Sequence, residues 1–428
     1  MSRLTKWLKI VTGFFLLHIS IKLSAQETTL TLEKAYTLAE QNYPLIKQRD
    51  LIKQTTQINI DNLSKGYLPQ VLLSGQASYQ SDVTKIDVSI PGFSFDPPSK
   101  DQYKAVADIS QVVFDGGVIK QQKTSQQING EVEEQKIEVE LYKIKDRINQ
   151  IYLSILFLDD QLKQVDLLKQ DLQTGIKQVE AQVNNGVVLR SNLNVLKAQL
   201  LQTDQKAIEI KATRKGLVQT LGLFINQSLN ENTELVRPAS PVVADKNIAR
   251  PELKLYKDLS NQLEQQNKLI RARNLPKTSL FLQGGYGKPG LNFLKNDFDF
   301  YYIGGVRINW SLAGLYTQKK EKELIKVNQR IVDVQRETFL LNTNTQLSQQ
   351  ESEIEKFNQL IETDQAIIDL RLQVKQAAKA QLENGVITAN DYLREVNAED
   401  QSHQSLITHQ IQLLQAQINY QTTLGNSK

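Results

Sequence analysis

The chain consists of two halves that repeat one order of segments: a β-hairpin, a very long helix, a turn and a returning helix. Tyr302 lies 199 positions after Tyr103, and Asn384 lies 199 positions after Asn185. The same spacing therefore links the strands to the helical turns in both halves. Repetition of this kind predicts a fold assembled from duplicated units.

The boundaries of the two repeats follow from this spacing. We expect a first repeat at residues 26–226, a polar connector at 227–249 and a second repeat at 250–428. Residues 1–25 are interpreted as a signal peptide that is removed, because basic residues precede a short apolar stretch that ends in Ser24-Ala25. An uncleaved signal anchor is the alternative.

Composition excludes several classes of site. The first 25 residues hold four of the 51 basic residues and no acidic one, which leaves 47 basic residues against 47 acidic residues. A neutral chain gives no reason to expect a nucleic-acid surface. There is no cysteine, so disulfides and thiolate sites are excluded. We expect no metal site and no cofactor, because His403 and His409 do not have same-face spacing on a helix.

Four segments alternate apolar and polar residues with the period of two that is typical of β-strands. They run from 68 to 80, from 103 to about 111, from 275 to about 286 and from 301 to 310. The proline-rich segment 89–100 is expected to be an irregular loop.

Two long proline-free segments, 117–184 and 316–383, are predicted to be helices. In the first, apolar residues step by alternating threes and fours, as in Leu141, Ile144, Ile148, Ile151 and Ile155. Its length is about 100 Å at 1.5 Å per residue. A seam of this kind needs a partner helix along its whole length.

Four strands cannot close a barrel, since small membrane barrels have eight or more strands. An open sheet would expose its edges and one apolar face. We therefore expect several copies to contribute strands to one barrel, with polar residues such as Lys104, Asp108 and Arg307 in a wet lumen. Five aromatic residues at strand ends are expected to form an interfacial girdle: Tyr79, Tyr103, Tyr286, Tyr302 and Trp310. A soluble β-sandwich patch is the alternative.

The order of short motifs resembles the TolC family of outer-membrane efflux and secretion channels. The stretch from Ile109 to Gly117, which reads ISQVVFDGG, is the most diagnostic. Others are Leu32-Glu33-Lys34-Ala35, Asn42-Tyr43-Pro44-Leu45, Tyr67-Leu68-Pro69-Gln70, Asn384-Gly385-Val386-Ile387 and Asp391-Tyr392-Leu393. The duplicated order makes the resemblance specific, although each motif alone is weak.

The resemblance implies a mainly α fold with a β-barrel. It implies a homotrimer whose 12-stranded barrel in the bacterial outer membrane continues as an α-helical barrel into the periplasm. It also implies a passive exit duct in a tripartite efflux or type I secretion system. The implied partners are a periplasmic adaptor protein and an inner-membrane transporter, with outer-membrane lipid around the barrel and no nucleic acid.

In the resembled family, the two helical turns form the periplasmic entrance and dock onto the adaptor. The corresponding residues here are Gly186, Val187, Val188, Gly385, Val386 and Ile387. The alternative is that each glycine only supplies a positive φ angle at a helix end.

Asp391 matches a family aspartate that rings the closed entrance. Three carboxylates around an axis would attract cations. The alternative is a helix N-terminal charge that complements the macrodipole. Asn192 stands where some relatives carry a second acidic ring, and Arg394 follows Asp391 by one helical turn, so an Asp391–Arg394 pair is a third possibility.

No enzyme signature occurs in the sequence, and we interpret Gly116-Gly117 as a turn or helix start rather than a phosphate nest. The chain is therefore not expected to be an enzyme. The functional alternative is a secreted structural coiled-coil or adhesin-like protein without a channel, which would not need the alternating hairpins.

Overall fold

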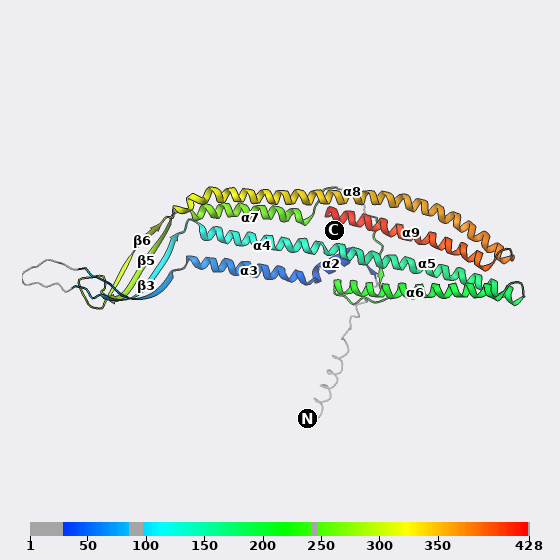
Figure 1. Cartoon of the computed structure of the whole chain (residues 1–428), viewed down its shortest axis with the longest axis horizontal. Coiled ribbons are helices and arrows are strands. Elements are labelled where there is room, and N and C mark those ends of the chain that lie inside the picture. Colours follow the sequence, from blue (N-terminus) through cyan, green and yellow to red (C-terminus); the bar gives the residue numbers. More distant parts are fainter. Residues whose placement is uncertain (1–28, 85–96, 241–245, 427–428) are drawn as a thin grey trace, which may run out of the picture.

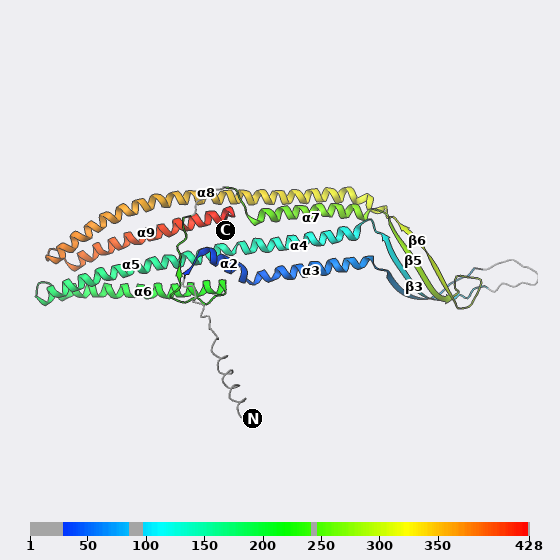
Figure 2. The same cartoon turned by 180° about the vertical axis from the view of Figure 1, so that it is seen from behind.

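The computed structural model describes residues 29–84, 97–240 and 246–426. Within these residues the molecule is elongated, with a β-sheet at one end and two helical turns at the other (Figure 1; Figure 2 gives the opposite view). The predicted signal peptide and most of the predicted loop at 89–100 lie outside the described residues.

Four antiparallel strands form the sheet: β2 (Gln70–Tyr79), β3 (Asp101–Phe114), β5 (Lys277–Lys288) and β6 (Asp299–Asn309). Their order in the sheet is β2-β3-β5-β6. The hairpins of the two repeats therefore meet at β3 and β5, while β2 and β6 are the two edges. This arrangement confirms the four strands that the sequence predicts.

Strand β3 is longer than predicted, because it continues past Gln111 to Phe114. Val112 pairs with Ser279 and Phe114 pairs with Thr278, so the residue between them is an extra residue in a β-bulge. A bulge reverses the alternation of side chains. The period of two therefore could not predict these last residues.

The helices run along the long axis of the molecule (Figure 1). Those of the first repeat are α2 (Leu32–Asn42), α3 (Lys47–Ser64), α4 (Val118–Tyr142), α5 (Ile144–Asn184) and α6 (Arg190–Ile225). Those of the second are α7 (Pro251–Arg273), α8 (Ala313–Glu383) and α9 (Ala389–Leu424). The sequence analysis did not single out α7, and it treated α4 and α5 as one helix, which the structure interrupts at Lys143.

The predicted heptad seam of α5 is the core of the helical part. Ile148 and Ile155 are fully buried in a cluster with Leu221 and Ile225 of α6. Burial of each such aliphatic side chain contributes about 1.5–3 kcal/mol. The long helices are thus held by side-by-side packing rather than by helix propensity.

Two short strands pair in parallel near the middle of the molecule: β1 (Thr29–Leu30) and β4 (Glu234–Leu235). The Tyr152 hydroxyl lies within hydrogen-bond distance of the carbonyl oxygens of Leu30 and Val236, at 2.6 and 2.7 Å, and shares its one proton between them. Burial raises the pKa of this phenol well above its usual value. The connector between the repeats is therefore tied to α5.

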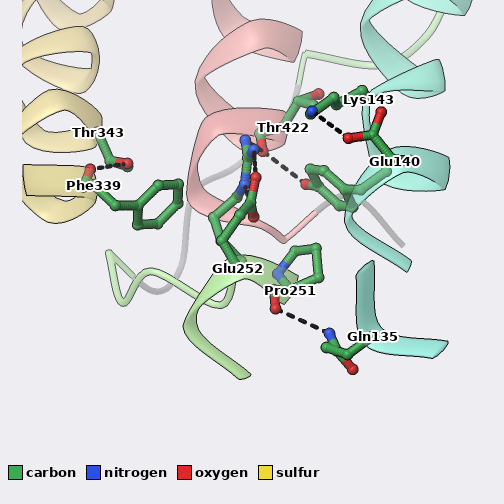
Figure 3. A network of polar contacts seen from close by, with 10 residues as sticks. Gln135, Glu140, Lys143, Pro251, Glu252, Phe339, Thr343 and Thr422 are labelled. Carbon is green, nitrogen blue, oxygen red and sulfur yellow. Dashed lines mark hydrogen bonds and ion pairs between the residues drawn. The ribbon is translucent and has the colours of Figure 1, made fainter. Parts of the chain in front are cut away.

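A polar network joins α4, α7 and α9 where the connector ends (Figure 3). The Arg250 guanidinium donates to both oxygens of Glu252, at 3.0 and 2.5 Å, and lies 4.7 Å from the centre of the Tyr142 ring. Tyr142 donates to the carbonyl of Thr422 at 2.7 Å, and Gln135 donates to the carbonyl of Pro251 at 2.9 Å. The network fixes the start of the second repeat against the end of the chain.

The ISQVVFDGG motif forms the junction between β3 and α4. The Asp115 carboxylate accepts hydrogen bonds from the backbone N–H groups of Gly117 and Ile119, at 2.8 and 2.6 Å. Gly116 and Gly117 have φ angles of 75° and 80°. The glycine pair is a turn that starts a helix, and its N-terminal N–H groups are already bonded to a side chain.

Candidate functional site

The two helical tips have the same backbone structure. Gly186 and Gly385 have φ angles of 71° and 69°, and the N–H of the following valine bonds back to the carbonyl of Gln182 or Gln381, at 2.9 and 2.8 Å. This is the Schellman arrangement that ends a helix. A Cβ atom on either glycine would have no atom within 4 Å. The glycines are therefore required for φ, and the space above them is open.

The predicted docking residues divide into two groups. Val187 and Val386 are 64% and 70% exposed, whereas Val188 and Ile387 are partly buried against a core cluster. Leu189 is 76% exposed and was missed by the sequence analysis. Its apolar neighbours Val187 and Val188 in the sequence were the only available signal. The first tip thus exposes more apolar surface than the second.

Asp391 belongs to a capping box at the start of α9. Its carboxylate accepts from the backbone N–H and the hydroxyl of Thr388, at 3.1 and 2.7 Å, while Thr388 Oγ1 accepts from the Asp391 N–H. These hydrogen bonds to Thr388 lower the pKa of the Asp391 carboxyl. Asp391 is partly exposed, so the capping role leaves its charge accessible to solvent.

The first tip lacks this box, because Leu189 and Asn192 stand at the corresponding positions. Leu189 makes no side-chain cap hydrogen bond to α6. Arg394 forms an ion pair with Glu395 at 3.0 Å. The structure thus pairs Arg394 with Glu395 and not with Asp391. The two tips therefore differ in charge and in capping.

Removal of the cap is expected to loosen the second tip alone. Thr388→Ala should accelerate amide hydrogen exchange in the first turn of α9 about five- to tenfold, as for loss of a typical N-cap. The first turn of α6 is the internal control and should not change. Equal acceleration in both turns would contradict the assignment.

The same box predicts a pH dependence. The folded pKa of Asp391 is depressed, so its contribution to stability is present above its unfolded pKa and is lost as the pH falls through the folded value. Exchange in the first turn of α9 should therefore rise more below about pH 4 than exchange in α6, which has Asn192 instead. A pH-independent ratio between the two turns would contradict this role.

A partly buried ionic cluster joins the two helical hairpins above the tips. Lys375 of α8 lies 2.9 Å from the carboxylate of Asp171 on α5 and 3.0 Å from that of Glu399 on α9. Burial opposes the charge of Lys375, but its hydrogen bonds to the two carboxylates outweigh this and raise its pKa. His403 contacts Glu399 at 3.2 Å.

The cluster was missed by the sequence analysis because its members come from three helices. Gln164 of α5 also donates to Asp400 of α9 at 3.0 Å. Nearer the tip, the Tyr392 ring packs over Gly175, where a Cβ atom would lie 3.1 Å from it. Polar and apolar contacts together hold α5 and α6 against α8 and α9.

Strand pairing places the predicted lumen residues on one face of the sheet. This face, here called the polar face, carries Ser74, Gln76, Ser78, Lys104, Asp108, Ser110, Gln283, Arg307 and Asn309. Gln283 donates to Asp108 at 3.4 Å, and the Arg307 guanidinium lies 4.5 Å from the centre of the Phe281 ring.

The opposite side, here called the apolar face, carries Val71, Leu73, Ile109, Leu280, Leu282, Val306 and Ile308. Leu73 and Ile308 are 75% and 69% exposed in the single chain. Aliphatic side chains so exposed in a continuous patch mark a surface that is covered by something else.

Aromatic residues lie at both ends of the apolar face. Tyr79, Tyr103, Tyr286 and Tyr302 lie toward the hairpin loops, and Trp310 follows β6 at the other end. Phe298 and Phe300 extend the first group: the Phe298 ring stacks with Tyr286 at a centroid distance of 5.4 Å, and the Phe300 ring is tilted against it at 4.5 Å. Eight residues separate Tyr302 from Trp310, about 26 Å along a strand and about 20 Å along the axis of a tilted barrel.

The described residues contain neither a metal-binding cluster nor a helix suited to cross a membrane. Among them, no group of three or more His, Asp or Glu side chains is placed to hold a metal ion. No helix within the described ranges is long and apolar enough to cross a membrane.

The first half of the chain matches a known protein family. Residues 35–224, which cover most of the first repeat, match the family described as outer membrane efflux protein. The resemblance to this family is confirmed. No curated protein sequence matches the chain significantly.

Solved structures share the fold over nearly the whole chain. The chain is similar to the outer membrane protein VceC of Vibrio cholerae, with a TM-score of 0.65, 14% identity and coverage of 92% of this chain and 96% of VceC. The CmeC outer membrane channel of Campylobacter jejuni gives 0.62 and 14%, covering 92% and 86%. The open state of the MtrE outer membrane channel of Neisseria gonorrhoeae gives 0.64 and 12%, covering 92% and 89%.

The comparisons confirm the predicted fold class, a long helical part combined with a small sheet. The similar structures include the second repeat, which the family match does not reach. At this low identity, the likeness concerns the fold and carries no residue roles.

Proposed function

We propose that three copies of the chain form an efflux channel in the bacterial outer membrane. In this proposal each copy contributes four strands to a shared 12-stranded barrel, and the long helices continue the channel into the periplasm. The proposal assigns the chain no enzymatic activity and no cofactor. It takes the family of the first repeat and the descriptions of the similar structures as its starting point.

One observation carries the proposal: a four-stranded sheet with two unpaired edges, one apolar face and one polar face, all accessible in the single chain. Edge strands that lack partners promote pairing with other chains. Closure around an axis would pair β6 of one copy with β2 of the next. It would also turn the apolar face to lipid and the polar face to a water-filled lumen.

The helical tips are proposed to face a periplasmic adaptor protein, which in turn connects to an inner-membrane transporter. Support comes from the open space above Gly186 and Gly385 and from the exposed Val187, Leu189 and Val386. Docking of an adaptor hairpin there would bury these side chains. The chain itself offers no nucleotide-binding motif, so the energy for transport would come from the transporter.

Channel formation is tested with the purified protein in planar lipid bilayers. The expected result is a heat-sensitive trimer that is soluble only with detergent and that adds discrete ion conductance to the bilayer. A monomer that stays in solution without detergent and adds no conductance would support the alternative, a secreted coiled-coil protein.

The proposed acidic ring at the tips is tested by Asp391→Asn, which removes the charge but keeps an oxygen that can accept from Thr388. Three carboxylates around the axis should favour cations, so this variant should lower the cation-to-anion permeability ratio. Asn192→Asp is the matched opposite change and should raise it. An unchanged ratio in both variants would remove the tips from the selectivity of the channel.

A further inference from the structure

The apolar face of the sheet contains a hollow of about 500 Å³. It is lined by Leu73, Ser74, Ala105, Val106, Ala107, Gly284, Gly285, Tyr286, Phe300 and Tyr301. The residues come from all four strands. The hollow thus extends across the middle of the sheet.

Strand pairing shows that the hollow opens on the apolar face. Leu73, Ala105, Ala107, Gly284, Tyr286 and Phe300 all point to that side. The other four residues form one cross-strand row, in which Ser74 pairs with Val106, Val106 with Gly285 and Gly285 with Tyr301. The backbone of this row is the floor, and its side chains point to the polar face.

The hollow exists because small residues on the two inner strands are surrounded by larger side chains on the same face. Ala105, Ala107 and Gly284 lie side by side on β3 and β5, and a Cβ atom on Gly284 would have no atom within 4 Å. Leu73 forms one wall, and the Tyr286 and Phe300 rings, 4.5 Å apart, form another. An apolar hollow leaves its walls without dispersion contacts unless an apolar group fills it.

A second copy of the chain does not fit as the occupant. In the proposed trimer, neighbouring copies join at the edges, β2 and β6, whereas the floor of small residues lies on the inner strands β3 and β5. On the apolar face of a membrane barrel, the remaining neighbour is lipid.

A cation lies beyond one end of the hollow. Lys288 is two residues past Tyr286 on the same face of β5 and pairs with Tyr103. The nearby Asp299 pairs with Gly287, faces the other side and forms its ion pair with Lys295 at 3.1 Å. An apolar hollow with a lysine and tyrosines at its outer end is complementary to a lipid that has an acyl chain and an anionic head group.

We infer that the hollow binds one acyl chain of a membrane lipid whose head group carries a net negative charge, with that head group at Lys288. The inference rests on the proposed function, because it requires the apolar face to lie in a membrane. It goes further in assigning one lipid to each subunit at a defined place on the sheet.

The test is native mass spectrometry of the full-length protein in detergent, titrated with phosphatidylglycerol and, separately, with the zwitterionic phosphatidylcholine. The wild-type trimer is expected to retain up to three phosphatidylglycerol molecules. Gly284→Leu places a side chain in the hollow without a clash and should reduce retention of phosphatidylglycerol at least tenfold. Ala107→Leu fills the same hollow from the neighbouring strand and should have the same effect. Lys288→Gln should reduce retention of phosphatidylglycerol to the level of phosphatidylcholine.

Thr278→Leu is the matched control, because Thr278 lies on the apolar face of the same strand as Gly284, six residues away, and does not line the hollow. It should retain lipid as the wild type does. A conducting trimer that retains no lipid, or equal retention by Gly284→Leu and wild type, would overturn the inference and leave the channel intact. A monomer that adds no conductance would instead overturn the proposed function.

Discussion

Replacement of Lys375 by methionine is expected to loosen the packing of the two helical hairpins by about 2–3 kcal/mol. Methionine fills a similar volume but leaves Asp171 and Glu399 without their shared cation. Loss of one partner of a buried pair costs about 3–5 kcal/mol, and the expected value is lower because Asp171 is 41% exposed. Amide exchange in α8 near residue 375 should become roughly 30- to 150-fold faster.

Two further variants separate this effect from a general loss of charge. Lys197→Met removes the cation of the half-exposed pair with Glu180 and should change stability by no more than about 1 kcal/mol. Glu399→Gln should recover part of the loss when combined with Lys375→Met, because it removes one of the two unpaired carboxylates. Similar exchange rates in Lys375→Met and Lys197→Met would contradict the claim that Lys375 holds the two helical hairpins together.

Replacement of Gly116 by alanine is expected to destabilise the junction between sheet and helices by about 2–4 kcal/mol. The φ angle of 75° is costly for alanine, about 1 kcal/mol. In addition, its Cβ atom would lie 2.6 Å from the carbonyl oxygen of Ala272 and 2.9 Å from Leu275 Cβ. One of the two segments must shift, and overpacking of this kind costs about 1–3 kcal/mol.

Gly117→Ala provides the matched comparison. Its φ angle of 80° is nearly the same, but a Cβ atom there would have no neighbour within 4 Å. It should therefore show only the conformational cost of about 1 kcal/mol. The measurement is the thermal unfolding midpoint of both variants in the same detergent, and equal shifts would show that contact with α7 is unimportant.

The long-range plan of the fold is predictable because it is periodic. The repetition at 199 residues indicates that the two halves share one order of elements. The period of two in the strands and the seam through Ile148 and Ile155 indicate which side of each element is buried. The bulge before Phe114 breaks such a period. Helix α7 precedes the strands and turns that carry the repeat spacing, so that spacing did not indicate it.

The candidate sites were less predictable for a related reason. Sequence motifs indicated the two tips, but they could not show that Ile387 packs inward while Leu189 is exposed. In the Lys375 cluster, Asp171 and Lys375 lie more than 200 positions apart in the sequence, so no local motif could predict their contact. The hollow beside Tyr286 depends on which small residues face one another across strands, which only the register determines.

The central claim is that strand β6 of one copy pairs with β2 of the next in a closed ring of three. Because the chain has no cysteine, a cysteine at Leu73 can be combined in turn with one at Tyr302, Gly304, Val306 or Ile308, all on the apolar face. Within one chain these positions lie on opposite edges of the sheet. Oxidation in lipid should give covalent trimers for one or two adjacent pairs and none for single cysteines. Only monomers at all four positions, or ladders longer than a trimer, would contradict the account.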